Sequence, residues 1–198
     1  MDSAHIKIQV ILASIRHGRF GDKPAHWILG EAKKLERVEA ELIDLKDYPL
    51  PFLEEETPPS AAKGNYADNM VKKFGKKISE ADAYIIVTPE YNHGYSGVLK
   101  NALDSIFVEW NNKPVAFVGY GGVGGARAVE QLRQVVIELQ MTPIRYAVHI
   151  PMEVYMAVMK EQVPTNPELF KPVVERAGSM LSQLLWFAKA LKAARQNK

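Results

Sequence analysis

Residues 6–21, IKIQVILASIRHGRFG, decide the fold class of this chain. Residues 6–13 are short, apolar and rich in β-branched side chains, a composition that predicts a buried β-strand. The loop that follows, 14–23, leads into Pro24, which suits the first turn of a helix. A strand, a loop and a helix in this order predict the start of a βαβ unit, in which successive strands are parallel.

The same alternation repeats along the chain. Further strands are expected at 40–45, 83–88, 115–120 and 144–150, and helices at 24–35, 70–78, 96–110, 126–139 and 173–191. Residues 47–62 carry four prolines (Pro49, Pro51, Pro58 and Pro59), which predicts irregular structure there. The pattern predicts an α/β fold, a flavodoxin-like three-layer sandwich with a five-stranded parallel sheet in the order 2-1-3-4-5. We expect residues 1–198 to form one domain.

Composition excludes several classes of protein. Charged residues make up 24% of the chain and hydrophobic residues 47%, which is typical of a globular domain. The absence of cysteine excludes disulfides, thiolate metal sites and cysteine nucleophiles. A net charge of +2 argues against nucleic acid as a partner. With no long apolar run and no signal-like start at residues 1–5, we expect a cytoplasmic protein that does not insert into membranes.

Parallel sheets of this order bind ligands beyond the carboxyl ends of their strands, which points to the loops 14–23, 89–95 and 121–125. The first loop offers the Ser14 hydroxyl, the Arg16 and Arg19 guanidiniums and a flexible Gly21 just before a helix. Helix N-termini and arginine forks both bind phosphate, so this loop predicts a site for a phosphate monoester. The alternative is a solvated basic loop in which Ser14 caps a turn.

The second loop, Pro89-Glu90-Tyr91-Asn92-His93-Gly94, presents two flat rings at a strand end. Tyr91 and His93 can lie against an aromatic cofactor, and Asn92 tolerates turn geometry. Either ring can instead belong to the loop's own packing or be exposed on the turn. Glu90 is a candidate catalytic carboxylate, but the stronger expectation is that it is solvated or paired with a neighbouring base.

The third loop is Gly121-Gly122-Val123-Gly124-Gly125. Bare amides there can donate to the carbonyls of a planar ring. Residues 119–124 also match GxGxxG, but only one strand follows them, which argues against a dinucleotide fold. The remaining alternative is that the glycines let a helix and a strand touch. A phosphate site, a ring platform and an amide-rich turn at one edge together fit FMN.

The chain resembles the NAD(P)H-dependent FMN reductases of the flavodoxin superfamily, which include quinone, azo-dye and chromate reductases. The resemblance rests on Ser14-Ile15-Arg16 with Arg19-Phe20-Gly21, on Pro89-Glu90-Tyr91-Asn92 followed by Leu99-Lys100-Asn101-Ala102-Leu103-Asp104, and on residues 121–127. One departure is that Arg19 and Phe20 stand where the family often has Ser and Asn.

The resemblance implies bound FMN, with its phosphate on the first loop and its ring between the second and third. It also implies NADPH or NADH as co-substrate, a small-molecule electron acceptor (quinone, azo compound, metal oxyanion or free flavin), ping-pong kinetics and a homodimer or homotetramer. A non-enzymatic FMN-binding electron carrier or redox sensor is the main alternative, and a phosphate-binding domain without redox activity is another. The candidates to hold a 2′-phosphate are Arg127, Arg133 and a lysine from a neighbouring subunit, and the sequence does not select among them. The Met-rich segment 152–163 is expected to be an interface, a lid or a packed helix.

Overall fold

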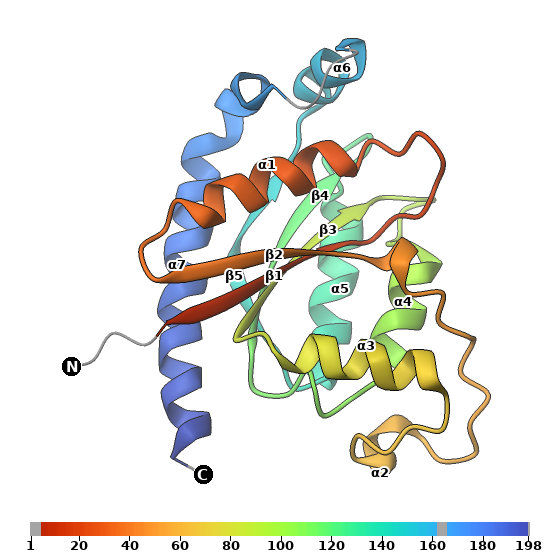
Figure 1. Ribbon diagram of the computed structural model, residues 1–198. Coiled ribbons are helices and arrows are strands. Elements are labelled where there is room, and N and C mark those ends of the chain that lie inside the picture. The colour runs from red at the N-terminus through yellow and green to blue at the C-terminus, as the bar shows by residue number, and fades with distance from the viewer. Residues whose placement is uncertain (1–4, 162–165, 198) are drawn as a thin grey trace.

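The computed structural model describes residues 5–161 and 166–197. Its sheet consists of β1 (Ile6–Leu12), β2 (Val38–Asp44), β3 (Ala83–Pro89), β4 (Pro114–Tyr120) and β5 (Thr142–His149) (Figure 1). All neighbouring strands are parallel, and their order is β2-β1-β3-β4-β5. The predicted fold class and strand order are therefore confirmed.

Helices cover both faces of this sheet. The longer ones are α1 (Asp22–Lys33), α3 (Asn69–Ser79), α4 (Gly97–Asp104), α5 (Ala126–Glu138), α6 (Met152–Lys160) and α7 (Lys171–Gln196). One apolar core joins the sheet to α1, α6 and α7, and a second joins it to α3, α4 and α5. Every residue of β3 and β4 is buried, as expected for central strands covered on both sides.

Aromatic side chains link the outer elements to these cores. On one face, the Trp27 ring stacks on Phe170 of the short 3-10 helix η2 (Pro167–Phe170), with ring centroids 4.7 Å apart. On the other face, Tyr84 and Trp110 meet edge to face at 5.0 Å. These contacts hold α1 and the start of α7 together and leave both faces of the sheet closed to ligands.

The predicted helix 96–110 is shorter in the structure, since α4 ends at Asp104. The Phe107 amide donates to the hydroxyl of Tyr66, 3.0 Å away, and not to a helical carbonyl. A side chain distant in sequence thus ends the helix. The proline-rich segment is mostly irregular, as predicted, but contains the 3-10 turn η1 (Leu45–Asp47) and the one-turn helix α2 (Pro59–Ala62).

The loops after β1, β3 and β4 leave neighbouring strands at one edge of the sheet, on the right in Figure 1. Because the two faces are covered, this edge is where backbone groups remain accessible. Among the described helices, none combines the length and the apolar character that a membrane span requires.

Candidate functional site

Arg19 holds the first loop in place. Its guanidinium donates to both carboxylate oxygens of Asp44 at the end of β2, to the Ser14 carbonyl, and through Nε to Asp22 at 3.0 Å. Only 9% of this side chain is exposed. The bonds to Asp44 raise the Arg19 pKa above its ordinary value. Burial alone would raise the pKa of the Asp44 carboxyl, but Arg19 outweighs it and holds that pKa low.

Because Arg19 fixes the first loop, the backbone amides of that loop face outward. The amides of residues 15–18 donate no hydrogen bond to any residue that the structure describes. Gly18 has a φ of +61°, and a Cβ placed there would meet nothing within 4 Å. Arg16, one of these four residues, has an exposed side chain. Its guanidinium makes no salt bridge within the described part of the chain.

The first and second loops contact each other through Tyr91. Its hydroxyl lies 2.8 Å from the Ser14 Oγ, and the Arg16 guanidinium carbon is 5.6 Å from its ring centroid. Two sequence-predicted residues of the first loop and one of the second are thereby brought together.

The second loop turns tightly at Asn92 and His93, whose φ angles are +49° and +71°. Tyr91 and Gly94 close the turn with two backbone hydrogen bonds of 2.8 and 3.0 Å. Left-handed backbone at a residue other than glycine costs about 1 kcal/mol or more, and such strain gathers at functional sites. Gln131 of α5 supports the turn by donating to the His93 carbonyl at 3.1 Å. The amides of Asn92 and His93 donate to no described residue.

Glu90 ties the second loop to the third. Its nearly buried carboxylate accepts from the Arg127 amide at 3.1 Å and from the Arg127 Nε at 2.6 Å. Burial alone would raise the Glu90 pKa, but these bonds outweigh it and hold the pKa below its ordinary value. Of the two expectations for Glu90, solvation or pairing with a base, the structure shows pairing with Arg127. An ionised carboxylate engaged in this way positions the loops.

The four glycines of the third loop differ in what surrounds them. A Cβ at Gly125 would lie 2.6 Å from the Tyr120 amide nitrogen, and one at Gly124 would lie 3.0 Å from the His149 Cβ. At Gly121 the obstacle is the Glu90 Cβ, also at 3.0 Å. Of these four glycines, only Gly122 is placed so that an added Cβ would meet no atom within 4 Å. The amides of residues 121–123 donate to no described residue, so this part of the turn faces outward.

The remaining candidates lie beneath the loops. The buried Phe20 ring packs against Tyr120 at 5.1 Å and against Tyr155 of α6 at 4.4 Å. A Cβ at Gly21 would lie 2.6 Å from the Tyr120 hydroxyl, and Pro89 is buried at the end of β3. Tyr120 was missed by sequence reasoning, although it ends a buried strand. Burial raises the pKa of its phenol, with Tyr91 adding to that effect.

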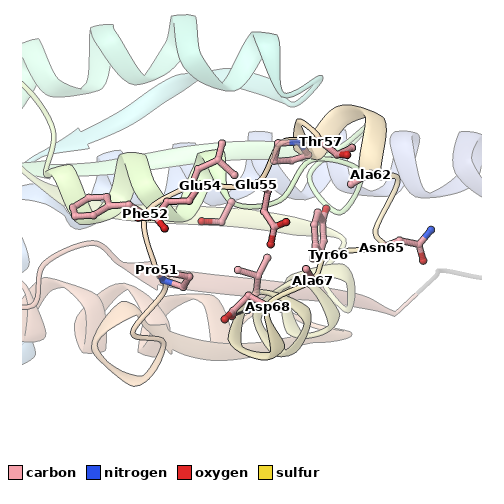
Figure 2. A pocket seen from close by; sticks show the side chains of 14 residues that line it. Pro51, Phe52, Glu54, Glu55, Thr57, Ala62, Asn65, Tyr66, Ala67 and Asp68 are labelled. Atoms are coloured by element: carbon pink, nitrogen blue, oxygen red, sulfur yellow. Dashed lines mark hydrogen bonds between the residues drawn. The ribbon is translucent and has the colours of Figure 1, made fainter.

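Two cavities flank this edge. One of about 780 Å³ lies between α3, α4 and the 51–57 segment, and its charged lining is acidic: Glu54, Glu55 and Asp68 (Figure 2). A second, of about 320 Å³, adjoins the first loop at Ile15 and His17. Neither is lined by residues of the second-loop turn or of the third loop.

The arrangement suits a phosphorylated, planar ligand. Unpaired amides occur on all three loops, at 15–18, 92–93 and 121–123. The first group, next to a helix N-terminus and Arg16, matches phosphate oxygens. The other two can donate to the carbonyls of a flat ring that lies between them. These residues therefore fit FMN.

Comparisons with known proteins agree with this geometry. A family model described as NADPH-dependent FMN reductase matches residues 6–154. An NAD(P)H-dependent FMN reductase of Schizosaccharomyces pombe is 37% identical over 147 residues, which cover 73% of this chain and 74% of that protein. An NAD(P)H:quinone oxidoreductase of Solanum tuberosum is 33% identical over 141 residues, covering 69% and 70%. The solved structure of the flavoenzyme FerB from Paracoccus denitrificans shares the fold, with a TM-score of 0.65, 21% identity and coverage of 90% of this chain and 97% of that one.

Replacing Arg19 by alanine (Arg19→Ala) is expected to lower the free energy of unfolding by about 3 kcal/mol at pH 7, because Asp44 loses its partner while nearly buried. The pairing with Arg19 lowers the pKa of Asp44 below its ordinary value of about 4. The pair therefore stabilises the fold fully above about pH 4, and this stabilisation is lost as the pH falls below that value. The difference between wild type and variant, measured by urea unfolding, should shrink below that pH. Arg16→Ala is the control and should unfold like wild type. Equal stability of wild type and Arg19→Ala at pH 7 would contradict this role.

Proposed function

Because the chain belongs to the NADPH-dependent FMN reductase family, we propose that it takes hydride from NADPH or NADH onto FMN and passes the electrons to a small oxidised acceptor. The prediction of an oxidoreductase that uses FMN and NAD(P)H is confirmed by the family and by its named relatives. Quinones, azo compounds, metal oxyanions and free flavins are the acceptor classes we propose. Relatives named as azoreductase and benzoquinone reductase support two of these.

The observation that carries the site proposal is the set of unpaired amides on three adjacent strand ends. We assign the FMN phosphate to the amides of 15–18, with Ser14 and Arg16, and the ring to the surface formed by residues 91–93 and 121–123. The other predicted site residues support these loops from beneath or from the side: Arg19, Phe20, Gly21, Pro89, Glu90, Gly124 and Gly125.

FMN, when bound, supplies the redox chemistry by accepting hydride and returning electrons. The chain supplies position and electrostatics. The amides of 121–123 favour negative charge on ring carbonyls beside them. The flanking side chains Ile15 and Val123 are 48% and 50% exposed, so the surface is open on both sides. One open surface serves the nucleotide and then the acceptor, which predicts ping-pong kinetics.

We also propose that the chain forms a homodimer or homotetramer in the cytoplasm. The α6 helix supports self-association, because Met152, Met156 and Met159 are all 43–48% exposed on one face, while Val154 and Val158 pack on the core. Residues 162 and 163 of the Met-rich segment lie outside the described residues. Sedimentation velocity checks the proposal, and a monomer at micromolar concentration would contradict it.

The function is tested by a visible spectrum of the purified protein with added FMN, followed by NADPH and NADH oxidation with a quinone. We expect flavin absorbance from the protein fraction after gel filtration, turnover, and parallel double-reciprocal plots at several quinone concentrations. A yellow protein without turnover would be an electron carrier or sensor. A colourless protein would be a phosphate-binding domain, and either result would overturn the proposed reaction.

Arg16→Ala should weaken FMN binding about tenfold, since a charge-assisted bond to phosphate contributes about 1.5–3 kcal/mol. Fluorescence titration of the apoprotein measures this dissociation constant. Riboflavin, which lacks the phosphate, is the matched control ligand, and its affinity should be unchanged. An equal loss for both ligands, or for neither, would place the phosphate elsewhere.

Gly122→Val and Gly124→Val separate ring binding from folding. The Cβ at Gly122 enters open space, so that variant should keep wild-type thermal stability and lose FMN affinity tenfold or more. Gly124 has a φ of +65° and faces His149, so its variant should melt at a lower temperature. Wild-type FMN affinity in Gly122→Val would remove the third loop from the ring site.

A further inference from the structure

The smaller cavity, of about 320 Å³, has features that the FMN site does not use. It lies between the first loop, the segment after β2 and the start of α4, and its lining includes Ile15, His17, Lys46, Tyr48, Val98 and Asn101. Most of the lining side chains are apolar, and the two ionisable groups other than the phenol are basic. No acidic side chain lines it.

Its walls are preformed. Asn101 of α4 donates to the carbonyls of Leu50 and Pro51, at 3.2 and 2.9 Å, and so fixes the segment after β2 against the helix. The half-buried Tyr48 ring is held by an edge contact with Phe74 at 5.2 Å and by the Lys73 ammonium at 5.6 Å from its centroid. The Tyr48 ring and the segment after β2 are therefore held in place before a ligand binds.

The two basic side chains that line this cavity form no salt bridge with an acidic side chain among the described residues. Lys46 and His17 are exposed and form no salt bridge within the described part of the chain, and Asp44, two residues before Lys46, is bridged to Arg19. The larger cavity is the reverse, since its charged lining is acidic and would repel phosphate. An anionic ligand with an apolar, flat part therefore favours the smaller cavity of the two.

The two arginines that the sequence offered for a 2′-phosphate are both engaged. Arg127 pairs with Glu90, and Arg133 donates to the carbonyls of Ile144 and Arg145, at 2.6 and 3.0 Å. Neither arginine that the sequence offered for a 2′-phosphate is therefore available without breaking a contact. Lys46 and His17 can bind a phosphate without breaking a salt bridge to any described residue.

Resting on the proposed function, we propose that this cavity binds the adenosine 2′-phosphate end of NADPH, with the base against Tyr48 and the phosphate at Lys46 and His17. Its volume is at the lower end of the roughly 300–1,000 Å³ of small-molecule sites, so it takes a nucleoside and not a whole dinucleotide. The cavity includes Ile15 and His17, which belong to the first loop, and Ser14 of that loop contacts Tyr91. The rest of NADPH therefore extends across the first loop to the ring surface, and NADPH is preferred to NADH.

The direct test is calorimetric binding of adenosine 2′,5′-bisphosphate to the FMN-loaded protein. Wild type should bind it, and Lys46→Glu should weaken binding tenfold or more. Lys189→Glu, which makes the same charge change on an exposed residue of α7, is the control and should bind like wild type. Val98→Trp, which fills the cavity without changing charge, should also abolish binding. It keeps the proposal testable if Lys46→Glu does not fold.

Kinetics supply a second, independent readout. Lys46→Glu should raise the KM for NADPH about tenfold at unchanged kcat. The KM for reduced nicotinamide mononucleotide, which has no adenosine, should not change. A rise in the KM of the quinone and not of NADPH would assign the cavity to the acceptor and overturn the proposal.

The proposal is also overturned if wild type does not bind the bisphosphate, or if Lys46→Glu and Val98→Trp both bind it normally. A change in sedimentation of both variants, with normal bisphosphate binding, would instead assign the cavity to a second copy of the chain. If the protein oxidises no nucleotide at all, the proposed function fails, while the calorimetry still decides whether the cavity is an adenosine phosphate site.

Discussion

A parallel sheet that is covered on both faces leaves only its strand ends for a ligand. Every residue of β3 and β4 is buried, so only the loops that follow these strands can contact a small molecule. The site that we propose for this chain is accordingly made of three loops at one edge. Its chemistry depends on how these loops are held more than on any single reactive side chain.

Three different interactions hold the loops. Arg19 ties the first loop to the end of β2, the Glu90–Arg127 pair ties the second to the third, and close backbone contact at Gly125 seats the third on β4. The Arg19 and Glu90 side chains are nearly buried, whereas Arg127 is 44% exposed. Each interaction leaves neighbouring amides that donate to no residue in the described part of the chain. Hydrogen-bond donors that are fixed before the ligand arrives need no reorganisation when it binds, which favours both affinity and charge stabilisation.

The sequence predicted the sheet order and the three loops because both follow from local patterns: apolar strand segments, helical spacing, and glycine or aromatic clusters just after a strand. It did not predict which loop side chains are bound to other parts of the chain. Arg19 looks like a phosphate ligand in sequence, but its partner Asp44 lies 25 residues away. The end of α4 is likewise set by Tyr66, 41 residues before the amide that it binds. Contacts between residues so far apart in the sequence depend on tertiary packing, and no local sequence pattern encodes them. The two cavities arise in the same way, because both are closed by the irregular segment after β2.

The most direct test of the account is a crystal structure of the chain grown with FMN. We predict the phosphate within hydrogen-bond distance of the amides of residues 15–18, and the ring between Asn92 and Gly122. Arg19 should remain on Asp44 and make no contact with the phosphate. Flavin bound in the acidic cavity, or at the opposite edge of the sheet, would contradict the account.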